Sequence, residues 1–257
     1  MSKPLILVTN DDGITSQGIS VLVKLMSRIG EVIVMAPNSP QSGMGHAITV
    51  GEPLRTKENR LFGEDIASFE CSGTPADCVK IAQFQLPKGR RFDLVVSGIN
   101  HGSNTSVSVL YSGTMSAAIE ASLDGTPAIG FSLCDYSNQA DFSHCEDLVV
   151  NIAKQTLEKG IPRGIALNVN IPAKQGLPIK GIKVCRQTNA RWGPSFDQRK
   201  DPHGQDYYWM KGDFINLDKG EDHDEWAIGN NYISIVPCQF DMTGHHGIRQ
   251  MNDEWDI

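Results

Sequence analysis

The chain has 257 residues, a length that fits one large domain or one domain with a substantial extension. Hydrophobic residues make up 40% of it, enough for a buried core, and the formal net charge of -7 argues against a nucleic-acid polymer as partner, because that requires a basic face. The sequence has no run of 18 apolar residues and no recognisable signal peptide, so we expect neither a membrane span nor export.

The N-terminal third predicts a β-α-β unit. Leu5–Thr9 is a short apolar run of the kind that forms a strand buried on both faces. The segment 18–28 places apolar residues on one helical face and is followed by Gly30. Residues 31–36 predict a second buried strand, which Pro37 ends. A parallel pair with a right-handed crossover follows from this order.

The middle of the chain continues the alternation. The segment 38–51 is predicted to be a loop with at most one short strand. A helix is predicted from Thr74 to about Gln83, with Thr74 as its N-cap and Asp77 in its acidic first turn, so both are assigned structural roles. Further strands are predicted at 92–97, 127–133 and 165–171, and further helices at 114–123 and 141–159. The fold class is therefore α/β with a mostly parallel sheet.

The character changes at about Pro172, beyond which we predict short strands and hairpins without a long helix. We expect residues 1–172 to form the catalytic domain and residues 173–257 a β-rich extension that packs on it. Six cysteines occur without a C-x-x-C spacing, which predicts free, mostly buried thiols in a reducing, cytoplasmic compartment.

Three polar loops follow predicted strands, at 10–13, 38–43 and 98–104. Ligands in open α/β sheets bind beyond the carboxyl ends of the strands, so the loops converge if the strands are parallel neighbours. Their oxygen donors suit a hard divalent cation. These donors are Asp11 and Asp12 in the first loop, Asn38, Ser39 and Ser42 in the second, and Asn100, Ser103 and Asn104 in the third.

A fourth loop precedes the helix predicted at 114–123. Free N–H groups at a helix start bind anions, and Ser112 and Thr114 add hydroxyl donors around Gly113. A cation site beside a phosphate site indicates phosphoryl chemistry. Two other polar features are ambiguous: His101 is a substrate-contacting or supporting residue, or simply a solvated loop histidine, and Asp222–Glu225 is predicted to be a solvated charge cluster.

Several motifs together resemble the SurE nucleotidases, in that family's order and over nearly the whole chain. The N-terminal motif is Val8–Gly13, and the last runs from Asp201-Pro202-His203-Gly204 to Tyr207-Tyr208-Trp209. The others are Ala36-Pro37, Gln41–Gly43, Ser72–Val79, Ser97–Asn104, Tyr111–Thr114 and Leu167–Pro172.

This resemblance implies a Rossmann-like three-layer domain with a C-terminal β-hairpin extension exchanged between subunits of a homodimer or homotetramer. It also implies hydrolysis of nucleoside 5′- and 3′-monophosphates with one divalent metal ion, Mg²⁺ or Mn²⁺. By position, it assigns metal binding to Asp11, Asp12, Ser42 and Asn100, and phosphate contacts to Asn104, Ser112, Gly113 and Thr114.

The expected mechanism uses Asp11 or Asp12 to orient or deprotonate the attacking water, and the sequence leaves open which one does so. One alternative is a phosphatase of the haloacid-dehalogenase type, although that family has Asp-x-Asp where this chain has adjacent aspartates. Another is a non-enzymatic, receiver-like module that binds metal and phosphate. Ser97-Gly98 and Phe131-Ser132 stand where a receiver needs an aspartate and a lysine.

Overall fold

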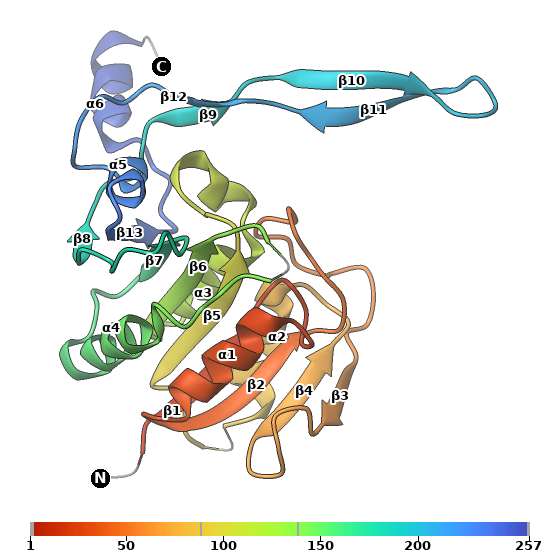
Figure 1. Ribbon diagram of the computed structural model, residues 1–257, viewed down its shortest axis with the longest axis vertical. Helices are drawn as coiled ribbons and strands as arrows, with labels where there is room; N and C mark the ends of the chain where they lie inside the picture. Colours follow the sequence, from red (N-terminus) through yellow and green to blue (C-terminus); the bar gives the residue numbers. More distant parts are fainter. Residues whose placement is uncertain (1–2, 88, 138, 256–257) are drawn as a thin grey trace.

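The computed structural model describes residues 3–87, 89–137 and 139–255, which form a nine-stranded sheet with helices on both faces and an extended arm (Figure 1). The strand order is β3-β4-β2-β1-β5-β6-β7-β13-β8. The strands of this sheet are β1 (Leu5–Thr9), β2 (Glu31–Pro37), β3 (Thr56–Asn59), β4 (Ala67–Cys71), β5 (Leu94–His101), β6 (Ala128–Cys134), β7 (Ile165–Pro172), β8 (Ile182–Val184) and β13 (Ile233–Gln239).

The centre of the sheet is parallel. β1 lies between β2 and β5 and pairs with both in parallel, and β6 and β7 continue in the same direction. β3 and β13 are antiparallel to their neighbours β4 and β7. The predicted α/β class with a mostly parallel sheet is confirmed. The loops after β1, β2 and β5 therefore leave the same edge of the sheet, as the sequence argument required.

Four helices complete three layers. α1 (Gln17–Met26) packs against α4 (Glu146–Lys159) on one face, and α2 (Pro75–Gln85) packs against α3 (Gly113–Leu123) on the other. Each face buries its own hydrophobic cluster. At the start of α1, a Cβ on Gly18 would lie 1.9 Å from the carbonyl oxygen of Ile99, so only glycine lets this helix approach β5 so closely. That approach sets the position of the end of β5, which runs to His101 and so carries Asn100, a residue predicted to lie in the loop 98–104.

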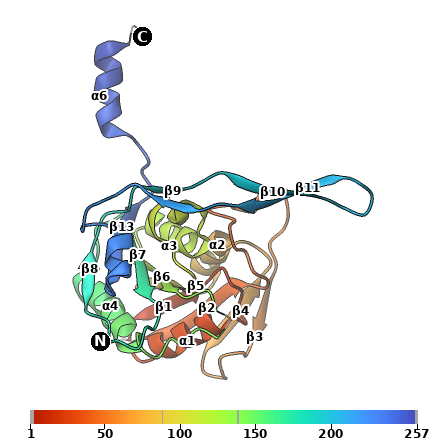
Figure 2. The same cartoon turned by 45° about the horizontal axis from the view of Figure 1, so that its top comes forward.

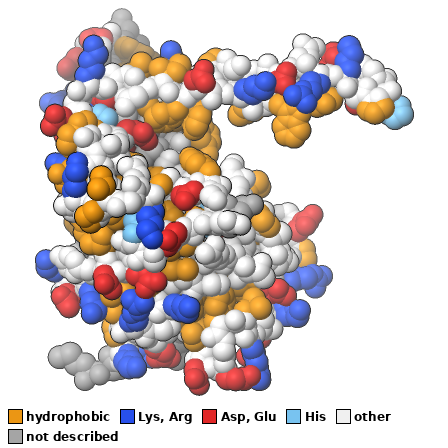
Figure 3. Space-filling model, viewed as in Figure 1, with side chains coloured by type: hydrophobic (Ala, Val, Ile, Leu, Met, Phe, Trp, Pro, Cys, Tyr) orange, Lys and Arg blue, Asp and Glu red, His pale blue; other side chains and the backbone are white. Residues whose placement is uncertain are grey.

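The extension has two parts. β8 and β13 join the main sheet, whereas β9 (Ala190–Trp192) and β12 (Phe214–Asn216) form a short ribbon that leads into β10 (Ser195–Lys200) and β11 (Asp206–Lys211). The β10–β11 hairpin projects from the body as an arm that carries exposed apolar side chains (Figure 3). α5 (Asp224–Gly229) packs on β13 and β7. α6 (His245–Glu254) extends away from the body, and none of its residues is buried (Figure 2).

Three sequence predictions need correction. Strands β3 and β4 were not predicted: β3 is polar and lies at an exposed sheet edge, and the five residues of β4 include the polar Ser68 and Glu70 and form no apolar run. The helix predicted from 141 begins at Glu146, since Asp141 and Ser143 form a turn in which the carboxylate accepts from the Ser143 N–H at 2.8 Å. The expectation of no long helix after Pro172 was wrong: α6 has ten residues.

The cysteines and the Thr74 cap agree with prediction. All six thiols are free, and four of them are buried. Thr74 and Asp77 form a reciprocal capping box at the start of α2, with Thr74 Oγ1 accepting from Asp77 N and Asp77 accepting from Thr74 N. Within the described ranges, none of the helices combines the length and the apolar character needed to cross a membrane.

Candidate active site

A hollow of about 230 Å³ opens at the carboxyl ends of β1, β2 and β5. Polar groups of four loops meet here, together with one residue of the extension. The hollow is lined by Asp11, Asp12, Ser42, Gly43, Asn100, His101, Asn104, Ser108, Tyr111, Ser112 and Trp192. Of the residues that the resemblance assigns to metal or phosphate, all except Gly113 and Thr114 lie on its wall, and those two lie directly behind Asp11. The other candidate oxygen donors, Asn38, Ser39 and Ser103, do not line it.

Asp11 is the most constrained of these side chains. It is 4% exposed, and its Oδ1 accepts a hydrogen bond of 2.6 Å from the Thr114 hydroxyl. A Cβ on Gly113 would lie 2.5 Å from the Asp11 Cβ, so α3 can start this close to the carboxylate only with glycine there. Burial raises the pKa of Asp11 to about 6, aided by the charge of Asp12 and opposed by the hydrogen bonds from Thr114. The carboxylate is thus held in one orientation and lacks compensating positive charge.

Asp12 and His101 face each other across the hollow. His101 Nδ1 lies 3.5 Å from Asp12 Oδ2, and the imidazole packs edge-on against Phe142 with ring centroids 5.5 Å apart. The hydrogen bond to Asp12 raises the pKa of His101, although partial burial opposes this. His101 is therefore a fixed residue of the crevice wall, and the alternative of a freely solvated loop histidine is wrong.

The second loop is tied to the first and to the start of α3. Gln41 N–H donates to the carbonyl of Asp11 at 2.8 Å, and Gly45 N–H donates to the carbonyl of Tyr111 at 3.2 Å. Ser42 lines the hollow, whereas Ser39 does not and instead lies 3.4 Å from the Gln41 amide. The geometry thus distinguishes two serines that the residue pattern alone left equivalent.

The third loop presents two amide side chains. Asn100 Nδ2 donates to the carbonyls of His101 and Gly102, at 3.3 and 2.8 Å, which leaves Oδ1 as its available ligand atom. Asn104 Nδ2 donates to the Ser132 hydroxyl at 2.8 Å. Two residues of β7 hold the Asn104 backbone. Asn170 Oδ1 accepts from the Asn104 N–H at 2.8 Å, and Asn168 Nδ2 donates to the Asn104 carbonyl at 2.8 Å. Neighbouring strands therefore fix the loop that closes this side of the hollow.

The fourth wall is the start of α3. Ser112 is its N-cap, with Oγ accepting from Met115 N–H at 3.0 Å, so the hydroxyl hydrogen can still donate to a ligand. The positive end of the helix dipole points into a hollow with two carboxylates on its floor. Thr114 is fully buried and bonded to Asp11, so in this structure its hydroxyl orients the carboxylate.

The charge of the hollow fits a divalent cation. None of the lining residues, all of which belong to the described chain, is lysine or arginine. An anion such as phosphate could approach Asp11 and Asp12 only if a bound cation neutralised the two carboxylates. The donors are carboxylate, hydroxyl and amide oxygens, as Mg²⁺ and Mn²⁺ prefer. No cluster of three His, Cys, Asp or Glu suited to a metal occurs in the described part, which is consistent with a set of two carboxylates and neutral oxygens.

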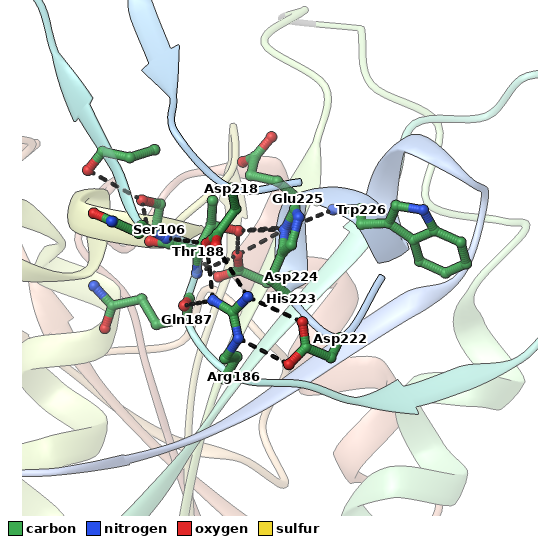
Figure 4. Close-up of polar contacts among 12 residues, drawn as sticks. Ser106, Arg186, Gln187, Thr188, Asp218, Asp222, His223, Asp224, Glu225 and Trp226 are labelled. Atoms are coloured by element: carbon green, nitrogen blue, oxygen red, sulfur yellow. Dashed lines mark hydrogen bonds and ion pairs between the residues drawn. The ribbon is translucent and has the colours of Figure 1, made fainter. Parts of the chain in front are cut away.

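A polar network fastens the extension to this wall (Figure 4). Asp224 is fully buried and accepts from the N–H groups of Ser106, Thr188 and Glu225, at 2.9, 3.0 and 2.9 Å. Arg186 pairs with Asp218 and Asp222 at the surface. The prediction of a solvated cluster at Asp222–Glu225 was therefore wrong for Asp224 and for His223, which is 3% exposed. The N–H groups of Ser106 and Thr188 lie far from Asp224 in the sequence, so a local pattern cannot reveal them. Their hydrogen bonds offset the cost of burying the charged carboxylate.

Three wall residues were not assigned a role in the site from the sequence: Ser108, Trp192 and Tyr111, the last of which was named only as part of the Tyr111–Thr114 motif. Tyr111 stands at the end of the 3₁₀ helix η1 (Ser106–Tyr111), directly before Ser112. Trp192 belongs to β9, in the part of the chain after Pro172 where only short strands and hairpins were predicted. No local signal connects Trp192 to Asp11, because their proximity depends on the folding of the whole extension.

Comparison with known proteins gives a consistent result. Residues 6–194 match the family described as survival protein SurE. The chain is 62% identical to the protein named 5′-nucleotidase SurE of Cytophaga hutchinsonii, covering 99% of this chain and 98% of that protein. It is 54% identical to the protein of the same name from Flavobacterium psychrophilum, covering 100% and 99%. The crystal structure of the SurE protein from Aquifex aeolicus superposes with a TM-score of 0.83 at 36% identity, covering 97% of this chain and 99% of that one.

Proposed function

This chain belongs to the SurE family, and from that premise we propose that it is a 5′-nucleotidase, a phosphomonoesterase that requires one divalent metal ion and hydrolyses nucleoside 5′- and 3′-monophosphates. The observation that carries the proposal is the pair Asp11 and Asp12 beside the α3 N-terminus, in a hollow without lysine or arginine. A phosphate ester needs both a cation and N–H donors at such a place.

Asp11, Asp12, Ser42 and Asn100 are the residues that would hold the metal ion. A bound Mg²⁺ or Mn²⁺ supplies neutralisation of phosphoryl charge and makes water more acidic. Asn104, Ser112 and the N–H groups at Gly113 and Thr114 would hold the other phosphate oxygens. Thr114 and Gly113 also hold Asp11 in place, so Asp12, which is partly exposed, is the better placed of the two carboxylates to orient the attacking water.

Phosphate release provides the direct test. Wild type, Asp12→Asn and the exposed control Asp65→Asn would be assayed at pH 7 with 5′- and 3′-nucleotides and EDTA, Mg²⁺ or Mn²⁺. We expect release that needs the metal, is unchanged in Asp65→Asn and falls about a hundredfold or more in Asp12→Asn. Release that persists in EDTA, or that stays within a few-fold of wild type in Asp12→Asn, would contradict the proposal.

The alternative receiver-like module is less well supported. Such a module binds phosphate through a lysine, and the hollow has none. Metal binding without release from any nucleotide would favour it. The division of the chain at residue 172 and the cytoplasmic location stay predictions; β13, from beyond residue 172, pairs with β7 in the main sheet.

We further propose that the β10–β11 arm is exchanged between subunits in a homodimer or homotetramer. All six residues of β11 are exposed, and Trp209 and Met210 expose 60% and 81% of their surface. Surfaces of this kind favour association. Light scattering would give two or four times the 28.1 kDa chain mass for wild type and a lower multiple for Met210→Glu. A monomeric wild type would refute the exchange.

A further inference from the structure

The hollow is too small for a whole nucleotide. Its volume is about 230 Å³, whereas sites that enclose a ligand measure about 300–1,000 Å³. Carboxylates, hydroxyls and amides line its floor, which suits the phosphate and not a flat apolar ring. If the phosphate lies beside Asp11 and Asp12, the nucleobase must lie outside the floor, against the rim.

The rim offers two aromatic side chains. Among the lining residues only Tyr111 and Trp192 have large aromatic rings, and they are 56% and 49% exposed. Trp192 also lines a second hollow, of about 740 Å³, at the base of the arm, so this residue is common to both hollows. A group that leaves the phosphate site toward the arm therefore passes Trp192.

Contacts on its far side hold the Trp192 ring in place. It packs edge-to-face on Phe214 of β12, with ring centroids 5.3 Å apart and an interplanar angle of 66°. The two residues are also register partners in the β9–β12 ribbon. A partly exposed tryptophan supported in this way loses little freedom when a second ring stacks on it.

The strand that carries Trp192 is itself anchored to the phosphate side. β9 packs against η1. Ser106 Oγ donates to the carbonyl of Thr188 at 2.9 Å, and the buried Asp224 accepts from both Ser106 and Thr188 (Figure 4). Only three residues lie between Thr188 and Trp192. The distance from the indole to the start of α3 is thus set by the fold.

We propose that Trp192, with Tyr111 beside it, is the nucleobase-binding platform of this enzyme and determines its preference for nucleotides over other phosphate esters. This inference rests on the proposed nucleotidase function and specifies its substrate site. Every base has an aromatic face, so stacking tolerates all bases and favours the larger purines. The platform therefore predicts broad base acceptance with a purine preference.

The test compares substrates that share the phosphate and ribose but differ in the base. KM and kcat would be measured with adenosine 5′-monophosphate, uridine 5′-monophosphate and ribose 5-phosphate for wild type, Trp192→Ala, Trp192→Phe and the control Phe84→Ala. Phe84 lies on α2 and is 88% exposed, so it tests the loss of an aromatic ring outside the crevice.

For Trp192→Ala we expect KM for adenosine monophosphate to rise about tenfold, within the range found for base–aromatic stacking, with kcat retained. KM for uridine monophosphate should rise less, and that for ribose 5-phosphate should not change. Trp192→Phe should keep most of the affinity, and Phe84→Ala all of it. An equal rise for ribose 5-phosphate would show a merely structural role, and unchanged KM for all three would place the base elsewhere; either result overturns the proposal.

A binding measurement separates this inference from the proposed reaction. Calorimetric titration with adenosine, which has no phosphate to lose, requires no turnover. Weaker binding to Trp192→Ala than to wild type and Phe84→Ala would support the platform even if no phosphate release were found. Equal affinity in the three proteins would refute it even if the enzyme were an active nucleotidase.

Discussion

The Thr114 hydroxyl donates a 2.6 Å hydrogen bond to Asp11, which joins the first turn of α3 to the loop after β1 across 103 residues of sequence. Replacing Thr114 by valine keeps the shape but removes the donor. We expect phosphate release to fall about tenfold to a hundredfold, as is usual when a residue supporting a metal ligand is lost, and the Mg²⁺ concentration for half-maximal rate to rise. Thr56→Val, at an exposed position of β3, should change neither quantity. A Thr114→Val enzyme with the rate of wild type would remove this hydroxyl from the site.

Gly113→Ala should displace the same carboxylate through a steric clash. The added Cβ would lie 2.5 Å from the Asp11 Cβ, so either the carboxylate or the start of α3 must move. We expect severe loss of phosphate release and a destabilisation of about 1–3 kcal/mol in urea unfolding. Gly51→Ala is the matched control because nothing lies within 4 Å of its Cβ position. Its stability should change by less than about 1 kcal/mol, and equal losses in both variants would contradict the steric explanation.

Asp77 should make stability depend on pH. Burial raises the pKa of Asp77, but hydrogen bonds from Thr49 and Thr74 outweigh it and hold the pKa below its usual 3.8. Because the folded pKa is lower than the unfolded one, the stabilisation is present above about pH 4. This stabilisation is lost as the pH falls through the pKa that Asp77 has in the folded protein.

Asp77→Ala leaves these donors without their acceptor, so we expect a loss of about 2–3 kcal/mol at pH 7. The difference between wild type and variant should shrink at pH 3, where the wild-type carboxylate is becoming protonated. Urea unfolding of both proteins at the two pH values measures this, with exposed Glu58→Ala as control. A difference that grows toward acid pH would reverse the sign and refute the argument.

Asp224 and Asp222 differ sharply although only one residue separates them. Asp224→Ala would leave the N–H groups of Ser106 and Thr188 without an acceptor in a buried position, costing about 2–4 kcal/mol and loosening the extension. Asp222→Ala breaks a solvent-exposed pair with Arg186, which water and salt screen, so stability should hardly change. Hydrogen exchange should show faster opening of residues 186–192 only in Asp224→Ala. Similar exchange in the two variants would mean that the network does not anchor the extension.

The β-α-β order and the meeting of three loops were predictable from the sequence because they depend on local patterns. Leu5–Thr9 and Glu31–Pro37 are apolar runs that end in turn residues, and parallel pairing places such ends at one edge. The Thr74 cap was predictable for the same reason, since its partners lie within three residues.

Features that depend on distant contacts could not be predicted in this way. Asp224 looks solvated until Ser106, 118 residues earlier, is placed beside it. The choice of Ser42 over Ser39 needs the Gln41–Asp11 hydrogen bond, which orders the loop. Trp192 reaches the site because β9 pairs with β12. Its register partner Phe214 follows the whole β10–β11 arm in the sequence.

The bond between Ser106 and Asp224 also has a consequence for biosynthesis. A ribosome adds roughly 5–20 residues per second, so the 118 residues between these partners represent roughly 6–24 s of translation. Asp11, Asp12, Tyr111 and the start of α3 are made before or early in that interval, and Trp192 follows within it, but the strand that carries Trp192 cannot be anchored until Asp224 has been made. A nascent chain would thus complete the loops that carry Asp11 and Asp12 before the Trp192 side of the rim is fixed in place, and the base selection that we propose for this rim would be the last property to mature.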